Sequence, residues 1–235
     1  MKNLKNWDNN TWLASDEYIK KFCSFIESKK KLNKNSKILD IGCGRANIIS
    51  KLEKKYRFKS KPTGIDIFRN KDIKKNVKFI KTDAKQFLKR KEKFDLIIIK
   101  QTIHLIKKKD QKIVINLCKK SLNKKGKLLI FSLNTKNNEL PVFPMFKKKL
   151  EKSLQNDERI LTTIKKILKN YKIHRFVFNV SIKKINYIRI IKMRYISCLI
   201  KMSSKEIKKG VREILVNYND EIKFRDILIC ISFSK

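Results

Sequence analysis

The 235-residue chain, 41% hydrophobic, is long enough for one α/β domain with its own core and short for two. It has no apolar run near the roughly 18 residues of a membrane span and no N-terminal signal segment, so we expect a cytoplasmic protein without membrane association. Its five irregularly spaced cysteines lack a CxxC pair, so we expect them to be reduced and to form no metal site. Its 61 basic and 21 acidic residues give a net charge of +40, but most basic residues are lysines spread along the whole chain, so nucleic acid is an alternative partner that the composition does not favour.

Up to residue 133 the chain alternates between helical and extended patterns. A helix is predicted over residues 16–29, behind Ser15 as its N-cap. Apolar runs predict strands at 37–41, 62–67, 77–81, 94–100 and 126–133. Helices are predicted between them near 46–56, 84–91 and 109–123, the last with Asp110 as its cap and Ile113 on its buried side. Short apolar strands separated by helices are typical of parallel βαβ units with right-handed crossovers.

Beyond residue 133 the pattern is less regular. Residues 134–171 are polar and partly helical, and residues 173–183 predict a strand. A long helical region follows, in which Ser203 and Glu206 form a predicted capping box, and a final strand is predicted at 222–233. We expect a single domain with four parts: an N-terminal arm and helix (1–35), a cofactor-binding core (36–133), an insert with a strand and cover helices (134–220) and a last strand (221–235).

The stretch ILDIGCGRA holds two glycines, Gly42 and Gly44, between a predicted strand and a predicted helix. Gly42 permits a tight turn, and Gly44 lets a ligand lie directly on the backbone. The free N–H groups of the following helix offer a seat for an anionic group. The two glycines alone leave a nucleotide, a dinucleotide and an empty turn open as alternatives.

Acidic residues stand at the ends of three successive predicted strands: Asp40, Asp66 and Asp83. Asp40 precedes the first glycine by two residues, where its carboxylate can meet a ligand ammonium. Asp66 lies 26 residues further on, near the separation at which a strand-end acid meets ribose hydroxyls. Asp83 can accept a hydrogen bond from an adenine amino group, and Gln101 completes the row after the fourth strand. Because ligands of open α/β sheets bind at this edge, the row predicts an adenosyl amino acid as the ligand.

Asp40-Ile41-Gly42-Cys43-Gly44 resembles the acid-x-Gly-x-Gly motif of the class I S-adenosylmethionine-dependent methyltransferases. The resemblance covers residues 36–133 and the closing pair of strands, and it includes the turn at residues 123–126 before the fifth strand. It implies a Rossmann-like α/β fold with a seven-stranded, mostly parallel sheet whose last strand is antiparallel. Ala46 departs from the family, which usually has a third glycine there. The cofactor implied is S-adenosyl-L-methionine, and the residues matched to its binding are Asp40, Gly42, Gly44, Asp66, Ile67, Asp83, Ala84 and Gln101.

Two flanking segments resemble the trans-aconitate and juvenile-hormone-acid methyltransferases, which methylate carboxylates of small molecules. They are WDNNTWL, from Trp7 to Leu13, and residues 193–207. Three aromatic residues are candidates for the substrate pocket, with core packing as the competing interpretation of each: Trp12, Phe143 and Tyr195. The resemblance implies O-methylation of a carboxylate or hydroxyl on a small-molecule acceptor.

His104, just past the fourth strand, is the candidate catalytic base for a hydroxyl or amine acceptor, and a pocket-wall or core position is its alternative role. A carboxylate acceptor needs no such base. Lys100-Gln101-Thr102-Ile103 replaces the Asn/Asp-Pro-Pro-Tyr of enzymes that methylate planar nitrogens, which disfavours that chemistry. The alternative functions are RNA methylation, motivated by the basic composition, and cofactor binding without catalysis.

Overall fold

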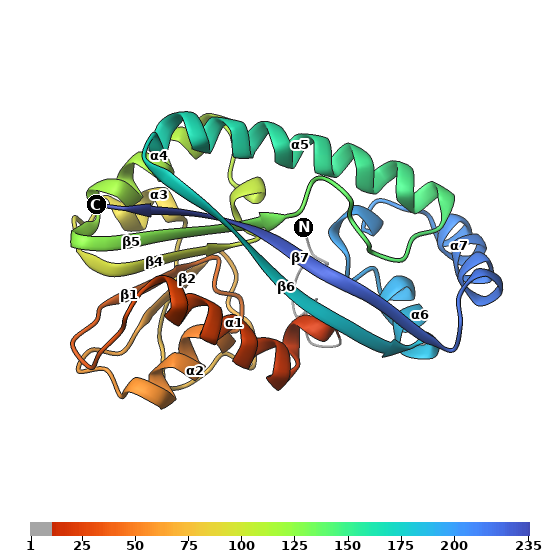
Figure 1. Cartoon of the computed structure of the whole chain (residues 1–235), viewed down its shortest axis with the longest axis horizontal. Helices are drawn as coiled ribbons and strands as arrows, with labels where there is room; N and C mark the ends of the chain where they lie inside the picture. The colour runs from red at the N-terminus through yellow and green to blue at the C-terminus, as the bar shows by residue number, and fades with distance from the viewer. Residues whose placement is uncertain (1–10) are drawn as a thin grey trace.

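Seven strands form a twisted sheet in the computed structural model, which describes residues 11–235 (Figure 1). Their order across the sheet is β3-β2-β1-β4-β5-β7-β6, and β7 runs antiparallel to both of its neighbours while β1 to β5 pair in parallel. The prediction of a Rossmann-like methyltransferase fold with an antiparallel last strand is therefore confirmed. The strands are β1 (Ile38–Ile41), β2 (Thr63–Asp66), β3 (Lys78–Lys81), β4 (Phe94–Lys100), β5 (Leu122–Leu133), β6 (Tyr171–Lys183) and β7 (Glu221–Ser234).

Helices cover both faces of the sheet. The α-helices are α1 (Asp16–Lys29), α2 (Asn47–Tyr56), α3 (Ala84–Leu88), α4 (Lys108–Lys120), α5 (Pro144–Leu168), α6 (Lys184–Lys192) and α7 (Ser204–Asn217), and the short 3-10 turns are η2 (Trp12–Ala14), η3 (Ile103–Leu105) and η4 (Ser197–Leu199). Two predicted start signals are confirmed: the Ser15 side chain accepts from the N–H of Tyr18, and Ser203 and Glu206 form a reciprocal capping box.

Neighbouring residues of the central strands enter opposite layers, because side chains alternate across a sheet. Ile98 of β4 packs in one core with α1 and α2, whereas Ile97 and Ile99 pack in the other core with α3 and α4 (Figure 1). Burial on both faces explains why the sequence of β4 is a continuous apolar run and not an alternating one. The first half of α5 joins the core that includes α1, and its second half joins the core that includes α4.

The strands β6 and β7 form a long antiparallel pair that extends past the rest of the sheet (Figure 1). They are paired from Tyr171↔Phe233 to Lys183↔Glu221, while β5 pairs with β7 only as far as Leu133↔Leu228. The far end of this pair carries α6 and α7. The predicted long helical region is thus two helices, separated at η4.

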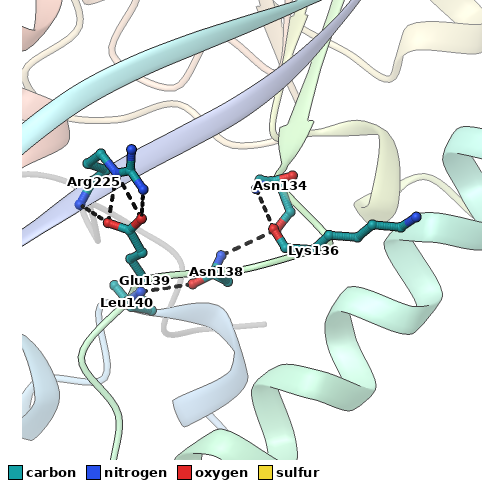
Figure 2. Close-up of polar contacts among 6 residues, drawn as sticks. All are labelled: Asn134, Lys136, Asn138, Glu139, Leu140 and Arg225. Atoms are coloured by element: carbon teal, nitrogen blue, oxygen red, sulfur yellow. Dashed lines mark hydrogen bonds and ion pairs between the residues drawn. The ribbon is translucent and has the colours of Figure 1, made fainter.

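The segment between β5 and α5 is tied to the start of β7 by side-chain contacts (Figure 2). The Arg225 guanidinium forms an ion pair with Glu139, and the Arg225 backbone N–H donates to the same carboxylate at 3.1 Å. Nearby, Asn138 accepts from the N–H of Leu140 at 3.0 Å, and its amide donates to the carbonyl of Asn134 at 3.4 Å. These contacts order the entry into α5, whose first residue is Pro144.

The fifth strand differs from its prediction at its start. It begins at Leu122 and not at residue 126, and its register against β4 shifts between Phe94 and Leu96. The predicted turn at residues 123–126 lies within this irregular start of β5. A Cβ on Gly126 would lie 2.8 Å from the carbonyl oxygen of Asn123 and 2.9 Å from that of Phe94, so glycine is required there.

Two details predicted for α4 are wrong. The N-cap is Lys107, and Asp110 lies in the first turn, where its carboxylate pairs with Lys85 at 2.7 Å. Ile113 is 41% exposed, because the buried face of the helix passes through Val114 and Cys118 and leaves Ile113 to one side. None of the helices in residues 11–235 combines the length and apolar composition that crossing a bilayer requires.

Candidate functional site

A cavity of 810 Å³ lies at the carboxyl ends of β1, β2 and β4 and is lined by the segments that follow them. This is the edge at which open α/β sheets bind ligands. Every residue matched to cofactor binding from the sequence lines this cavity: Asp40, Gly42, Gly44, Asp66, Ile67, Asp83, Ala84 and Gln101. The structure therefore brings together residues that are separated by up to 61 positions, from Asp40 to Gln101.

The two glycines of the turn suit their positions for different structural reasons. Gly42 has φ +73°, and a Cβ there would lie 2.2 Å from Oγ1 of Thr102. Gly44 has φ +56°, but a Cβ there would meet no atom within 4 Å. Gly42 is thus required by packing inside the protein, whereas Gly44 leaves open space above the backbone on the cavity side.

Ala46 occupies the position of the third family glycine in a left-handed conformation. Its φ is 62°, and it is the fully buried N-cap of α2. An L-residue pays about 1–2 kcal/mol for this backbone region, which glycine does not. Ala46 therefore holds a backbone conformation that glycine adopts more readily, and it adds local strain to the turn.

The Asp66 carboxylate joins the end of β2 to the glycine turn. It accepts from the N–H of Gly44 at 3.0 Å and from the N–H of Phe68 at 3.1 Å. Asp83 is the N-cap of α3 and accepts from the N–H of Gln86 at 2.9 Å. An ionised carboxylate has about four acceptor positions, so each of the two can hold these backbone groups and still receive a ligand hydroxyl or amine.

Asp40 is 3% exposed at the end of β1. Burial raises the pKa of its carboxyl to about 7, the Lys100 ammonium opposes that rise, and the Asp66 carboxylate adds to it. At neutral pH the carboxyl therefore exchanges between its neutral and charged forms. A ligand cation beside it would favour the charged form.

The remaining four candidates do not line the cavity. His104 lies in η3, and burial lowers its pKa, which keeps the imidazole neutral at pH 7. The Trp12 indole donates to Asp226 at 2.9 Å, Phe143 is buried against the Cα of Gly210, and Tyr195 is half-buried between α6 and η4. The catalytic role of His104 and the substrate-pocket roles of the other three stay predictions that the shape of the cavity does not support. Trp7 lies outside the described residues.

Apart from Leu13, which ends the WDNNTWL segment, several cavity residues were not predicted from the sequence. Leu13 and Ile19 give it an apolar wall from the N-terminal side, and Arg45, paired with Asp72 at 2.9 Å, closes it beside the turn. Lys100 is the last residue of β4 and also lines the cavity. Its strand-end position was a usable signal, since it stands directly before Gln101 in the same row as the acids.

The sequence profile of a methyltransferase-domain family matches residues 32–177. A search of curated protein sequences gives no significant match. Among solved structures, the plantazolicin methyltransferase BpumL, crystallised with S-adenosylhomocysteine and a desmethyl-plantazolicin analogue, is 18% identical, with a TM-score of 0.56 over 100% of this chain and 90% of that one. A putative methyltransferase of Bacillus halodurans is 14% identical (TM-score 0.54, 91% of this chain and 98% of that one), and a SAM-dependent methyltransferase of Archaeoglobus fulgidus is 17% identical (TM-score 0.52, 94% of each). At these identities the likeness shows the fold.

Proposed function

The chain belongs to the methyltransferase-domain family and is an S-adenosylmethionine-dependent enzyme, and from this premise we propose that it methylates an oxygen of a small, acidic acceptor. The observation that carries the proposal is the cavity, in which the glycine turn and three strand-end acids converge.

The residues of the cavity fit the cofactor in three places. The open space over Gly44 admits a ligand against the backbone, and the ionised form of Asp40 suits an α-ammonium group. Asp66 stands at the end of β2, where ribose hydroxyls would meet its free acceptor positions. Asp83 and Ala84, at the start of α3, would contact the adenine ring.

Cations at the cavity favour an acceptor with a negative charge. Lys89 and Lys107 are exposed and line it, and Lys85 lines it beside Asp110. Lysines around a cleft attract an anionic ligand and raise its local concentration. The net charge of +40 adds a long-range field of the same sign.

Transfer to a carboxylate requires alignment more than acid–base chemistry. When bound, the cofactor supplies a methyl group on a positively charged sulfur, which a carboxylate oxygen can accept directly. The apolar wall of Leu13 and Ile19 would limit the access of water to the bound partners, and the lining residues would hold them close. A hydroxyl acceptor would instead need a base, and the neutral imidazole of His104 is the candidate only if η3 presents it to the cavity.

RNA is the second candidate acceptor, and the observation that favours it is the net charge of +40. It predicts binding that weakens steeply as salt concentration rises, because each phosphate contact releases counterions. The lysines at the cavity serve either acceptor, so the charge by itself does not separate the two.

The experiment is a transfer assay with methyl-labelled cofactor against three fractions of a cell extract: acidic metabolites, other metabolites and RNA. Mass spectrometry of the products locates the label. Label on a carboxylate or hydroxyl in the acidic fraction supports the proposal. Label in RNA, label on nitrogen, or cofactor binding without transfer to any fraction would overturn it in favour of the alternatives.

A further inference from the structure

Three ionisable side chains lie in a row on the α1 face of the sheet, at its carboxyl edge. Asp40 of β1 is opposite Ile98 of β4, and Lys100, two residues further on, lies on the same face because side chains alternate. Lys100 is opposite Phe131 of β5, which is opposite Cys230 of β7. The alternation places Asp226 on the same face as Cys230, four residues toward the carboxyl edge.

Lys100 lies between the two carboxylates, over an aromatic surface. Its Nζ is 5.1 Å from the ring centroid of Tyr18 and 5.3 Å from that of Phe22, both in α1. These distances allow a favourable interaction between the ammonium and the ring faces. The Lys100 charge lowers the pKa of both Asp40 and Asp226, against the burial that raises each.

The other groups near Asp40 do not supply a positive charge. Asp66 adds a negative one, and Cys43, whose thiol pKa is raised well above its usual value by burial, stays neutral. The Tyr18 hydroxyl is also neutral, because burial and then the Asp226 carboxylate raise its pKa. Among the described residues, Lys100 is the cation whose charge acts on Asp40.

We propose that Lys100 is a positioning residue for cofactor binding: its ammonium, held on the α1 face between Asp40 and Asp226, shifts Asp40 toward the charged form that receives the α-ammonium of the cofactor. This rests on the proposed role of Asp40. Lys100 also explains how two buried carboxylates, each less than 8% exposed, are accommodated on one face of the sheet.

The test compares Lys100→Met, which keeps length and removes charge, with Lys100→Arg, which keeps charge. Lys112→Met is the matched control, because Lys112 is an exposed lysine of α4 that does not line the cavity. Two quantities are measured from pH 6 to 8.5: the affinity for S-adenosylhomocysteine by calorimetry, and the titration of the Asp40 carboxyl in the cofactor-free protein by ¹³C NMR. Asp40→Asn assigns the NMR signal, and Lys100→Gln replaces Lys100→Met if the latter does not fold.

Wild-type affinity is expected to rise as the pH passes about 7, where Asp40 ionises. In Lys100→Met the rise and the NMR titration both move up by one pH unit or more, so affinity at pH 7 falls about fivefold or more and the deficit narrows toward pH 8.5. Lys100→Arg and Lys112→Met are expected to follow the wild type. An unchanged Asp40 titration in Lys100→Met, or a loss of affinity that is equal at every pH, would overturn the proposal. A wild type that binds no cofactor would instead refute the proposed function, and the NMR titration distinguishes the two failures.

Discussion

The half of the chain from β1 to β4 and the half from α5 to β7 build their polar interiors in different ways. In the first half, the three acids of the cavity and Gln101 lie at or just past the carboxyl ends of strands, so their positions are set by a few neighbouring residues. In the second half, the buried Asp226 is hydrogen-bonded to Trp12, 214 residues away, and no charged partner among residues 11–235 lowers the pKa of the buried Asp157. The positions of the cavity residues therefore depend on neighbouring sequence, whereas the polar interior of the half from α5 to β7 depends on packing between distant residues.

Substitutions of the two turn glycines should have the largest effects on stability in the half from β1 to β4. Gly42→Ala is expected to lower the free energy of unfolding by about 2–4 kcal/mol, because its Cβ would overlap Thr102 and its φ is +73°. Gly44→Ala is expected to cost only about 1 kcal/mol, since its Cβ meets no protein atom. Urea unfolding measures both.

Cofactor affinity should distinguish the Gly42→Ala and Gly44→Ala variants in the opposite order from stability. Gly44→Ala keeps its fold but places a methyl group in the cavity, so its affinity for S-adenosylhomocysteine should fall. Equal losses of stability in the two variants, or full affinity in Gly44→Ala, would contradict the distinction between a packing glycine and a ligand-facing one.

The Trp12–Asp226 hydrogen bond tests the second half. Trp12→Phe removes the donor at 2.9 Å and leaves a buried carboxylate oxygen unpaired, which should cost about 1–3 kcal/mol of stability. A double-mutant cycle with Asp226→Ala, which removes the acceptor, isolates this bond. If Trp12→Phe instead keeps its melting temperature and loses turnover of an acceptor, Trp12 belongs to the substrate pocket and its role here is not structural.

Asp157 in α5 gives the second half a pH dependence. Burial raises its pKa from 3.8 to about 6, so the folded state binds more protons than the unfolded state between these values. Stability is therefore lost as the pH rises from about 4 to 6 and stays lower above that range. Asp157→Asn should raise stability by about 1–2 kcal/mol at pH 8 and give no gain at pH 4. Thermal melts at the two pH values check this, and an equal gain at both would contradict it.

The sequence predicts the features that depend on neighbouring residues and misses those that depend on distant ones. Asp40, Asp66, Asp83 and the two glycines could be placed because a strand end fixes the position of a side chain along the edge of the sheet. The buried face of α4, the irregular start of β5 and the surroundings of Phe143 could not, because each depends on contacts with distant residues. Phe143, for example, fits only because residue 210 is a glycine, a relation that no local pattern reveals.

Ala46→Gly is expected to have the smallest effect. Glycine relieves the strain of φ 62°, about 1–2 kcal/mol, but loses a buried methyl group and gains freedom in the unfolded chain, which together cost a similar amount. Stability should change by less than about 1 kcal/mol, and cofactor affinity by less than about threefold. A tenfold gain in affinity would mean that the missing third glycine limits binding.

Calorimetric titration with S-adenosylhomocysteine shows whether the carboxyl-edge cavity binds the cofactor through its strand-end acids. Asp66→Ala is compared with Asp95→Ala, whose carboxylate also holds two groups, the N–H of Lys37 and the amide of Asn123, each at 2.8 Å, but stands at the amino end of β4. We expect the wild type and Asp95→Ala to bind alike and Asp66→Ala to bind at least about tenfold more weakly, a loss of about 1.4 kcal/mol or more. A wild type that does not bind, or an Asp66→Ala variant that binds as tightly, would contradict the account.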